Sequence, residues 1–167
     1  RQWVHDLRQF LLKLYWVTSK SMQVLRRRPT EQYGEDQHQN EFNVQPQVVP
    51  SWLQDWLESK GGYLIGNIRT GRPDFRFYSL GNSLACMFGV LTAPQQRALF
   101  RLVLHNRHHL MAQMPMRICH PPMDGAEWEN KTGSDPKNWP WSYHNGGHWP
   151  SLLWFFGASI LLHERRY

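Results

Sequence analysis

The stretch that decides the fold is APQQRALFRLVLHNRHHLMAQ, residues 93–113, in which apolar side chains return every three or four positions. This spacing is typical of an amphipathic helix. The residues expected to face inward are Leu99, Phe100, Val103, Leu104 and Leu110. Thr92 and Gln95 have the spacing of a capping box, and Pro94 suits a first helical turn. We therefore predict a helix from Ala93 to about Gln113 and work outward from it.

Helical spacing recurs on both sides of this segment. It predicts helices over Trp3–Tyr15 and Ser79–Leu91, and a last helix that begins at Pro150. A short helix, Trp52–Lys60, is expected to end where Gly61 and Gly62 follow, because glycine favours the left-handed conformation at a helix C-terminus.

The segments between these helices are rich in glycine, proline and polar residues. Residues 29–49 are polar and predict a loop, and residues 62–82, GYLIGNIRTGRPDFRFYSLGN, are typical of a short strand or extended loop. Residues 120–147 form a long Pro-rich loop before the last helix. We expect an all-α fold in which antiparallel helix pairs place their long connecting loops at one end, and function is expected in those loops.

Composition limits the possible functions. The chain has 167 residues, 41% hydrophobic and 19% charged, which is typical of one globular domain. Its net charge of +6 is concentrated in runs such as Arg26–Arg28, and lysine is scarce, so we do not expect nucleic-acid binding. The longest apolar run, Trp149–Leu162, is too short to span a bilayer, so no membrane association is expected. Two separated cysteines, Cys86 and Cys119, suit a reducing compartment such as the cytoplasm.

Aromatic residues gather in one loop, DPKNWPWSYHNGGHWPSLLW, residues 135–154. An indole can cover the apolar face of a sugar ring, while amide and imidazole groups bind its hydroxyl rim. The candidate platforms are Trp139, Trp141, Tyr143 and Trp149. His144 and Asn145 could supply the hydrogen bonds, and the following glycines allow close backbone approach. The alternative is that these tryptophans only fill the protein core.

Long segments of the chain resemble the alkaline/neutral invertases, a glycoside hydrolase family that cleaves sucrose. The similar segments are RRRPTEQYG, PSWLQDWLESKGGYLIGNIRTGRPDFRFYSLGN and RICHPPMDGAEWENKTGSDPKNWPWSYHNGGHWPSLLWF. They cover nearly the whole chain in the family's order. The resemblance implies that residues 1–167 are an incomplete catalytic domain, the C-terminal-side portion of an (α/α)6 barrel.

The resemblance also implies a set of site residues. Its YHNGGHWP segment suggests that Trp141, His144, Asn145 and Trp149 contact substrate. The segment GRPDFRF adds Arg72, Asp74 and Arg76, with an ionised Asp74 that either contacts substrate or only holds the loop through ion pairs. Glu127 is a weaker candidate.

The implied activity is that of a β-fructofuranosidase of the sucrose α-glucosidase type, which releases glucose and fructose by acid/base catalysis without metal or cofactor. The general-acid Asp and general-base Glu are expected outside this chain, so we expect these 167 residues alone to be inactive. The parent enzyme is expected to be a homo-oligomer, cytoplasmic unless a transit peptide precedes residue 1.

Three alternatives stay open. The loop carboxylates Asp124, Glu127, Glu129 and Asp135 could form an acid/base pair within the chain. The chain could instead be a non-catalytic carbohydrate-binding or structural fragment. A metal site is the third, with candidate ligands His105, His108, His109, Cys119 and His120. Solvated helix histidines are the better interpretation of that last set, because no paired-cysteine spacing accompanies them.

Overall fold

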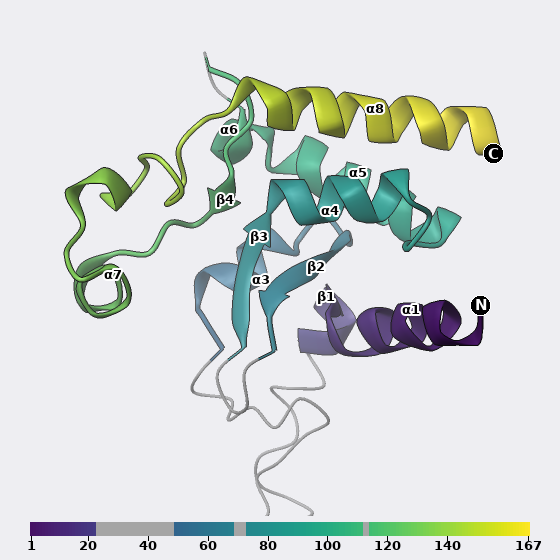
Figure 1. Ribbon diagram of the computed structural model, residues 1–167, viewed down its shortest axis with the longest axis horizontal. Coiled ribbons are helices and arrows are strands. Elements are labelled where there is room, and N and C mark those ends of the chain that lie inside the picture. Colours follow the sequence, from purple (N-terminus) through teal and green to yellow (C-terminus); the bar gives the residue numbers. More distant parts are fainter. Residues whose placement is uncertain (23–48, 69–72, 112–113) are drawn as a thin grey trace, which may run out of the picture.

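An antiparallel sheet lies at the centre of the molecule. The computed structural model describes residues 1–22, 49–68, 73–111 and 114–167. Within them, four strands pair in the order β1-β2-β3-β4, each antiparallel to its neighbour (Figure 1). The strands are β1 Trp16–Thr18, β2 Gly62–Asn67, β3 Asp74–Tyr78 and β4 Cys119–His120.

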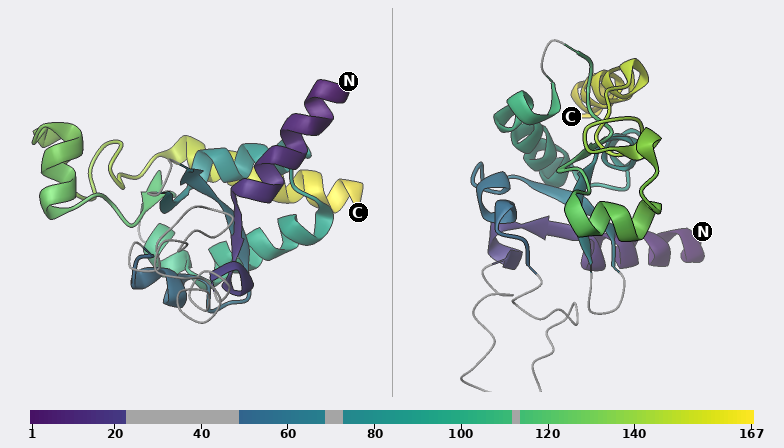
Figure 2. Two further views of the ribbon diagram at one scale, coloured as in Figure 1. Left: turned by 90° about the horizontal axis from the view of Figure 1, so that it is seen from below. Right: turned by 90° about the vertical axis from the view of Figure 1, so that its left-hand side faces the viewer.

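Helices surround this sheet. They are α1 Gln2–Leu14, α3 Trp52–Trp56, α4 Ser79–Met87, α5 Ala93–His105, α6 Arg107–Leu110, α7 Gly125–Thr132 and α8 Pro150–Arg166, with a 3-10 turn η2 at Pro136–Asn138. Helix α8 lies along α4, and α5 packs against β2 (Figures 1 and 2). The two termini lie at one end of the molecule, and α7 extends from the opposite end in both figures.

The core forms where the sheet meets α5. Tyr63 of β2 and Phe77 of β3 are buried with their rings 5.7 Å apart. Leu99 and Leu102 of α5 are buried in the same cluster. A fully buried leucine contributes about 2 kcal/mol through the hydrophobic effect, so this junction fixes β3 and the residues that follow it.

The expected all-α fold, and with it the expected portion of an (α/α)6 barrel, is wrong for this chain. Residues 62–82 do not form one short strand or loop, because they supply β2, β3 and the start of α4. Ile65 pairs with Phe77 across the β2–β3 ladder, and β1 and β4 add to its two edges. Extended backbone in a core needs partner strands to satisfy its N–H and C=O groups, and here those partners come from distant parts of the sequence.

The predicted helices are confirmed at most positions, with corrections to their ends. The helix expected from Ala93 to about Gln113 ends at His105, and α6 follows after Asn106. The buried Asn106 side chain donates to the carbonyl oxygens of Leu102, 3.1 Å away, and Trp56, 3.0 Å away, so it ties the helix end to α3. Leu104, expected to face inward, is 65% exposed.

The predicted capping box at the start of α5 is confirmed. The side-chain Oε1 of Gln95 accepts hydrogen bonds from the Thr92 backbone amide at 3.0 Å and from the Thr92 hydroxyl at 2.8 Å. The predicted loop at residues 29–49 and the run Arg26–Arg28 lie outside the described residues, except for Val49.

Candidate functional site

The first part of the candidate site is an ion-pair cluster that joins β3 to α7. Arg76 Nη1 lies 3.0 Å from Asp74 Oδ1 on the same strand. Its Nη2 forms a second ion pair with Glu127 of α7, and Glu127 also pairs with Lys131 one helical turn later. Tyr78 donates its hydroxyl to the second oxygen of Asp74 at 2.9 Å. Three of the predicted site residues, Asp74, Arg76 and Glu127, are therefore in one network.

The cluster lines a pocket of about 410 Å³. Trp52 of α3, Pro50 and Pro73 supply its apolar walls, and the cluster supplies its polar wall. Arg72, the remaining predicted residue of this segment, lies outside the described residues.

Electrostatics favour the charged forms of Arg76 and Glu127. Burial alone lowers the pKa of Arg76, but the hydrogen bond to Glu127 and the charge of Asp74 outweigh burial and raise it. Burial raises the pKa of Glu127. Hydrogen bonds from Arg76 and Lys131 lower this pKa by a larger amount, so its net shift is downward. A carboxylate held in this way is suited to positioning Arg76 and poorly suited to donating a proton near neutral pH.

The second part is the aromatic loop, residues 135–149. Its turn places Trp141 at φ 72°, Tyr143 at φ 43° and Gly146 at φ 92°, all in the left-handed region. A Cβ on Gly147 would stand 2.5 Å from the Tyr143 carbonyl oxygen, so only glycine fits there. Local sequence therefore determines the turn.

Asn145 anchors this loop from within. It is 1% exposed, and its Oδ1 accepts the Met123 amide at 2.6 Å. Its Nδ2 donates to the carbonyl oxygens of Met123 at 2.8 Å and Asn138 at 3.0 Å. The side chain predicted to bind a sugar rim thus has both ends of its amide engaged by backbone, which joins two stretches of the long loop.

The rings around Asn145 stay accessible. Trp141 is 45% exposed, and the Arg117 guanidinium lies over its ring with Cζ 4.3 Å from the centroid. His144 stacks on Trp149 at 5.7 Å and 12°, and Trp149 donates its indole N–H to the Tyr143 carbonyl oxygen at 3.2 Å. Trp139 and Trp141 are therefore exposed and do not fill the core, whereas Trp149 is half-buried and packs against it.

Strand β4 connects the two parts. Its buried Cys119 has Sγ 3.9 Å from the His144 carbonyl oxygen. Burial raises the pKa of the Cys119 thiol to about 11, and the charges of Arg76 and Asp74 act on it with opposite signs. The ion-pair cluster and the aromatic loop therefore lie on either side of this short strand.

Sequence reasoning missed two residues beside the loop. Arg117 was given no role, although it covers Trp141. His120, considered only as a metal ligand, stacks on Trp56 at 4.6 Å and 18° and is 9% exposed. The segment RICH shows no local alternation typical of a strand, and its partner β3 could not be identified locally.

Two of the other loop carboxylates, Asp124 and Asp135, cap helices, whereas Glu129 is exposed on α7. Asp124 accepts the Gly125 amide at 2.7 Å at the start of α7, and Asp135 accepts the Lys137 amide at 3.0 Å at the start of η2. Hydrogen bonds from Asn138 and Lys137 lower the pKa of Asp135. These contacts favour N-cap roles over an acid/base pair within the chain.

No three His, Cys, Asp or Glu side chains in the described ranges are grouped closely enough to hold a metal ion. None of the helices described is both long enough and apolar enough to cross a membrane.

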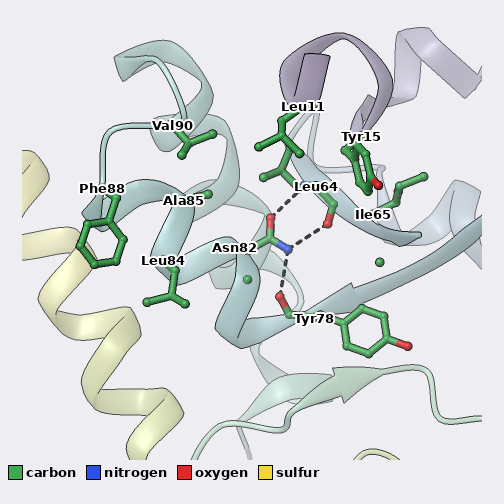
Figure 3. Close-up of a pocket in the computed structure, with 12 residues that line it drawn as sticks. Leu11, Tyr15, Leu64, Ile65, Tyr78, Asn82, Leu84, Ala85, Phe88 and Val90 are labelled. Carbon is green, nitrogen blue, oxygen red and sulfur yellow. Dashed lines mark hydrogen bonds between the residues drawn. The ribbon is translucent and has the colours of Figure 1, made fainter. Parts of the chain in front are cut away.

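A second pocket, of about 460 Å³, lies between α1, β2 and α4 (Figure 3). Its walls are mostly apolar, with Leu11, Leu64 and Val90 among them. The one amide in it, Asn82, donates to the carbonyl oxygens of Leu64 at 3.0 Å and Tyr78 at 2.9 Å and accepts the Leu64 amide at 2.8 Å. The lining of this pocket includes no carboxylate or imidazole that could act as a general acid or base.

Comparisons with known proteins agree with one family. The chain matches the family described as alkaline and neutral invertase over residues 1–167. It is 46% identical over 152 residues to neutral/alkaline invertase 1, mitochondrial, of Oryza sativa subsp. japonica, covering 91% of the chain and 24% of that protein. It is 46% identical over 147 residues to alkaline/neutral invertase C, mitochondrial, of Arabidopsis thaliana, covering 88% and 22%.

A cytosolic relative gives the same result. Cytosolic invertase 1 of Oryza sativa subsp. japonica is 39% identical over 158 residues, which cover 95% of the chain and 28% of that protein. The chain thus spans about a quarter of the length of the curated relatives it matches. By a family match over its whole length and by these identities, the chain belongs to the alkaline and neutral invertases.

Proposed function

We propose that residues 1–167 are part of a larger catalytic domain that hydrolyses sucrose to glucose and fructose. The observation that carries this proposal is the family match over residues 1–167. The exposed aromatic loop supports it, because stacked flat rings beside hydrogen-bonding groups suit a sugar ring better than they suit a protein core.

In this proposal the aromatic loop binds substrate. Trp141, His144 and Trp149 contact the sugar, and Asn145 acts by holding the loop at Met123 and Asn138. Arg76 and Asp74, with Arg72, form the neighbouring wall, and Glu127 fixes the Arg76 guanidinium toward the 410 Å³ pocket.

Proton transfer is assigned to residues outside this chain. A general-acid Asp donates a proton to the glycosidic oxygen, and a general-base Glu activates water on the opposite face of the sugar. The cap positions of Asp124 and Asp135 and the ion pairs of Glu127 support this assignment, because these three carboxylates already have structural roles. The reaction needs no cofactor in this scheme.

The test is sucrose hydrolysis by the complete enzyme that carries this chain, with products and anomeric configuration followed by NMR. Trp141→Ala should lower kcat/KM at least tenfold, since a stacking platform is lost. Leu104→Ala, which truncates an exposed side chain on α5 outside the loop, is the control and should change kcat/KM less than twofold. Equal effects of both substitutions, or absence of sucrose hydrolysis, would exclude the proposal.

We extend the proposal to location and assembly. The names of the relatives place them in mitochondria or the cytosol. We propose a cytoplasmic enzyme, or an organellar one if a transit peptide precedes residue 1, that assembles as a homo-oligomer.

A further inference from the structure

An electropositive cluster, of which the proposed hydrolysis uses only Trp141, surrounds Arg117. The Arg117 cluster consists of Arg117, His108, His109, His120, His148 and Trp141. We infer that this cluster binds a small doubly charged oxyanion, either inorganic phosphate or the phosphoryl group of a sugar phosphate.

Arg117 is the centre of the cluster and has donors to spare. Its guanidinium is held flat over Trp141, and Nη1 donates to the Gly146 carbonyl oxygen at 2.9 Å. In the described part of the chain no carboxylate forms an ion pair with it. A guanidinium carries five N–H donors in a fixed fork, so a stacked Arg117 is preorganised for a planar pair of oxygens.

The cluster also contains four imidazole side chains. Ring centroids of His108 and His109 are 4.0 Å apart, and those of His109 and His120 are 4.6 Å apart. His120 lies 5.7 Å from Trp141, and His148 pairs with Arg117 in an antiparallel bridge. Three separate chain segments therefore deliver these side chains to one place.

Two buried nitrogens of the cluster have no hydrogen-bond partner among the residues that the structure describes. They are Nδ1 of His120, a residue only 9% exposed, and Nε2 of His148. A buried polar atom without a partner is costly, and an oxyanion with several lone pairs is the kind of ligand that satisfies N–H donors from several sides.

The pKa shifts of the imidazoles in the cluster also favour an anionic ligand. Burial lowers the pKa of His120 to about 3, and His109, Arg117 and His108 lower it too. Burial and Arg117 likewise lower the pKa of His109 and of His148, with His108 acting on His109 as well. No carboxylate acts on any of these imidazoles to offset the positive charge. Bound oxyanion would favour their protonated forms, so binding should take up protons.

The neighbouring loop narrows the ligand class. Trp141 belongs both to the Arg117 cluster and to the aromatic loop, so a sugar joined to a phosphoryl group could contact both. The inference itself rests on Arg117 and the imidazoles and does not require sucrose hydrolysis.

The first experiment uses sulfate, which keeps its double charge between pH 5 and 8, as the probe of the complete enzyme in titration calorimetry at constant ionic strength. Saturable binding is expected to tighten as pH falls from 8 to 6, by up to tenfold per pH unit for each proton taken up. Arg117→Gln should weaken it at least tenfold. Arg107→Gln, on the exposed side of α6, is the matched control and should change it less than twofold.

Arg117→Lys keeps the charge and covers the case in which Arg117→Gln does not fold. It should retain partial sulfate affinity, because the ammonium keeps the charge but lacks the planar fork. No saturable sulfate binding, or equal weakening by the Arg117 and Arg107 variants, would overturn the inference. Sucrose hydrolysis is measured in parallel, so a failure here is separate from a failure of the proposed function.

The two sources of the phosphoryl group are separated by three further titrations, with inorganic phosphate, a hexose phosphate and the unphosphorylated hexose. A hexose phosphate at least tenfold tighter than inorganic phosphate assigns a sugar phosphate to the site. Equal affinities assign the free anion. Binding of the hexose alone with the same affinity as its phosphate contradicts an oxyanion site.

Discussion

Asn145 shows how one buried amide can position a whole recognition loop. Its three hydrogen bonds join residues 123 and 138 across the long loop. Asn145→Ala leaves a buried backbone N–H and two carbonyls without partners, each costing roughly 1–3 kcal/mol when water cannot replace the amide. We predict a loss of about 3 kcal/mol in the free energy of unfolding, measured by denaturant titration of the complete enzyme.

Asn130→Ala is the matched control for this substitution, because Asn130 is an exposed asparagine on the neighbouring α7. It should change stability by less than about 0.5 kcal/mol. A stable Asn145→Ala variant that resists proteolysis within residues 123–147 would show that the loop is held by other contacts.

His120 gives the molecule a pH dependence with a defined sign. Burial, then His109, Arg117 and His108, lower its folded-state pKa to about 3, against an ordinary value of 6.5. Its contribution to stability is therefore complete above pH 6.5 and is lost as pH falls toward 3. Between pH 7 and pH 5 we predict a loss of up to about 2 kcal/mol from this residue in the free energy of unfolding.

His120→Phe should flatten this part of the stability profile, since phenylalanine can keep the stack on Trp56 without titrating. His5→Phe, on the exposed side of α1, should leave the wild-type slope in place. Urea titrations at pH 5, 6, 7 and 8 supply the data, and an unchanged slope in His120→Phe would contradict the assignment.

At the scale of elements, Arg76 is the link between the sheet and α7. Arg76→Met removes the cation that pairs with Asp74 and leaves Glu127 with Lys131 alone, beside a partly buried wall. Since Asp74 and Glu127 keep side-chain exposures of 20% and 37%, water screens part of the loss, and we predict about 2 kcal/mol rather than the 3–5 kcal/mol of a fully buried pair.

Lys131→Met removes the other partner of Glu127 and is the matched control, with an expected loss below about 0.5 kcal/mol. Because the pKa of Glu127 is lowered, its ion pairs add stability above pH 4.5 and lose it as pH falls below that value. Thermal unfolding of both variants at pH 7 and pH 4 distinguishes them, and identical losses would mean that Arg76 does not carry the link.

Helices were predictable from the sequence and the sheet was not. The capping box and the 3.6-residue spacing of residues 93–105 are local signals, so α5 was found with its start correct. The break at Asn106 depends on the Trp56 carbonyl, a partner fifty positions away, and so could not be seen. In the same way β1 and β4 are short segments whose only evidence is pairing with distant strands.

The candidate site likewise has one part that local sequence predicted and another that it could not predict. The aromatic loop was located correctly as an exposed feature, because its rings and glycines are adjacent in sequence. The pairing of Arg76 with Glu127 and the contact of Arg117 with Trp141 join residues far apart in the sequence. Substrate contact by Trp141, His144 and Trp149 stays a prediction, and for Asn145 we propose instead a role in holding the loop.

At the scale of the whole molecule, apolar surface is exposed along two helices. The exposed side chains are Trp3, Val4, Leu7 and Phe10 on α1, and Leu153, Trp154, Phe155 and Leu161 on α8. None of the α1 side chains is buried. Contiguous apolar surface of this kind usually marks contact with another part of a protein, and the matched relatives are about four times the length of this chain.

We therefore predict that the isolated 167-residue chain associates with itself and hydrolyses no sucrose above the buffer rate, whereas the complete enzyme hydrolyses sucrose. Self-association follows from the exposed faces of α1 and α8, and Trp154→Lys, which changes a 72% exposed indole to a cation, should reduce it in sedimentation velocity. Inactivity follows from the proposed place of the general acid and the general base outside this chain, since losing each proton-transfer group costs about 10²–10⁴-fold in rate. Sucrose turnover by a monomeric isolated chain would require two carboxylates within residues 1–167 to act as acid and base, and Asp124, Glu129 and Asp135 would then be the residues to change to amides first.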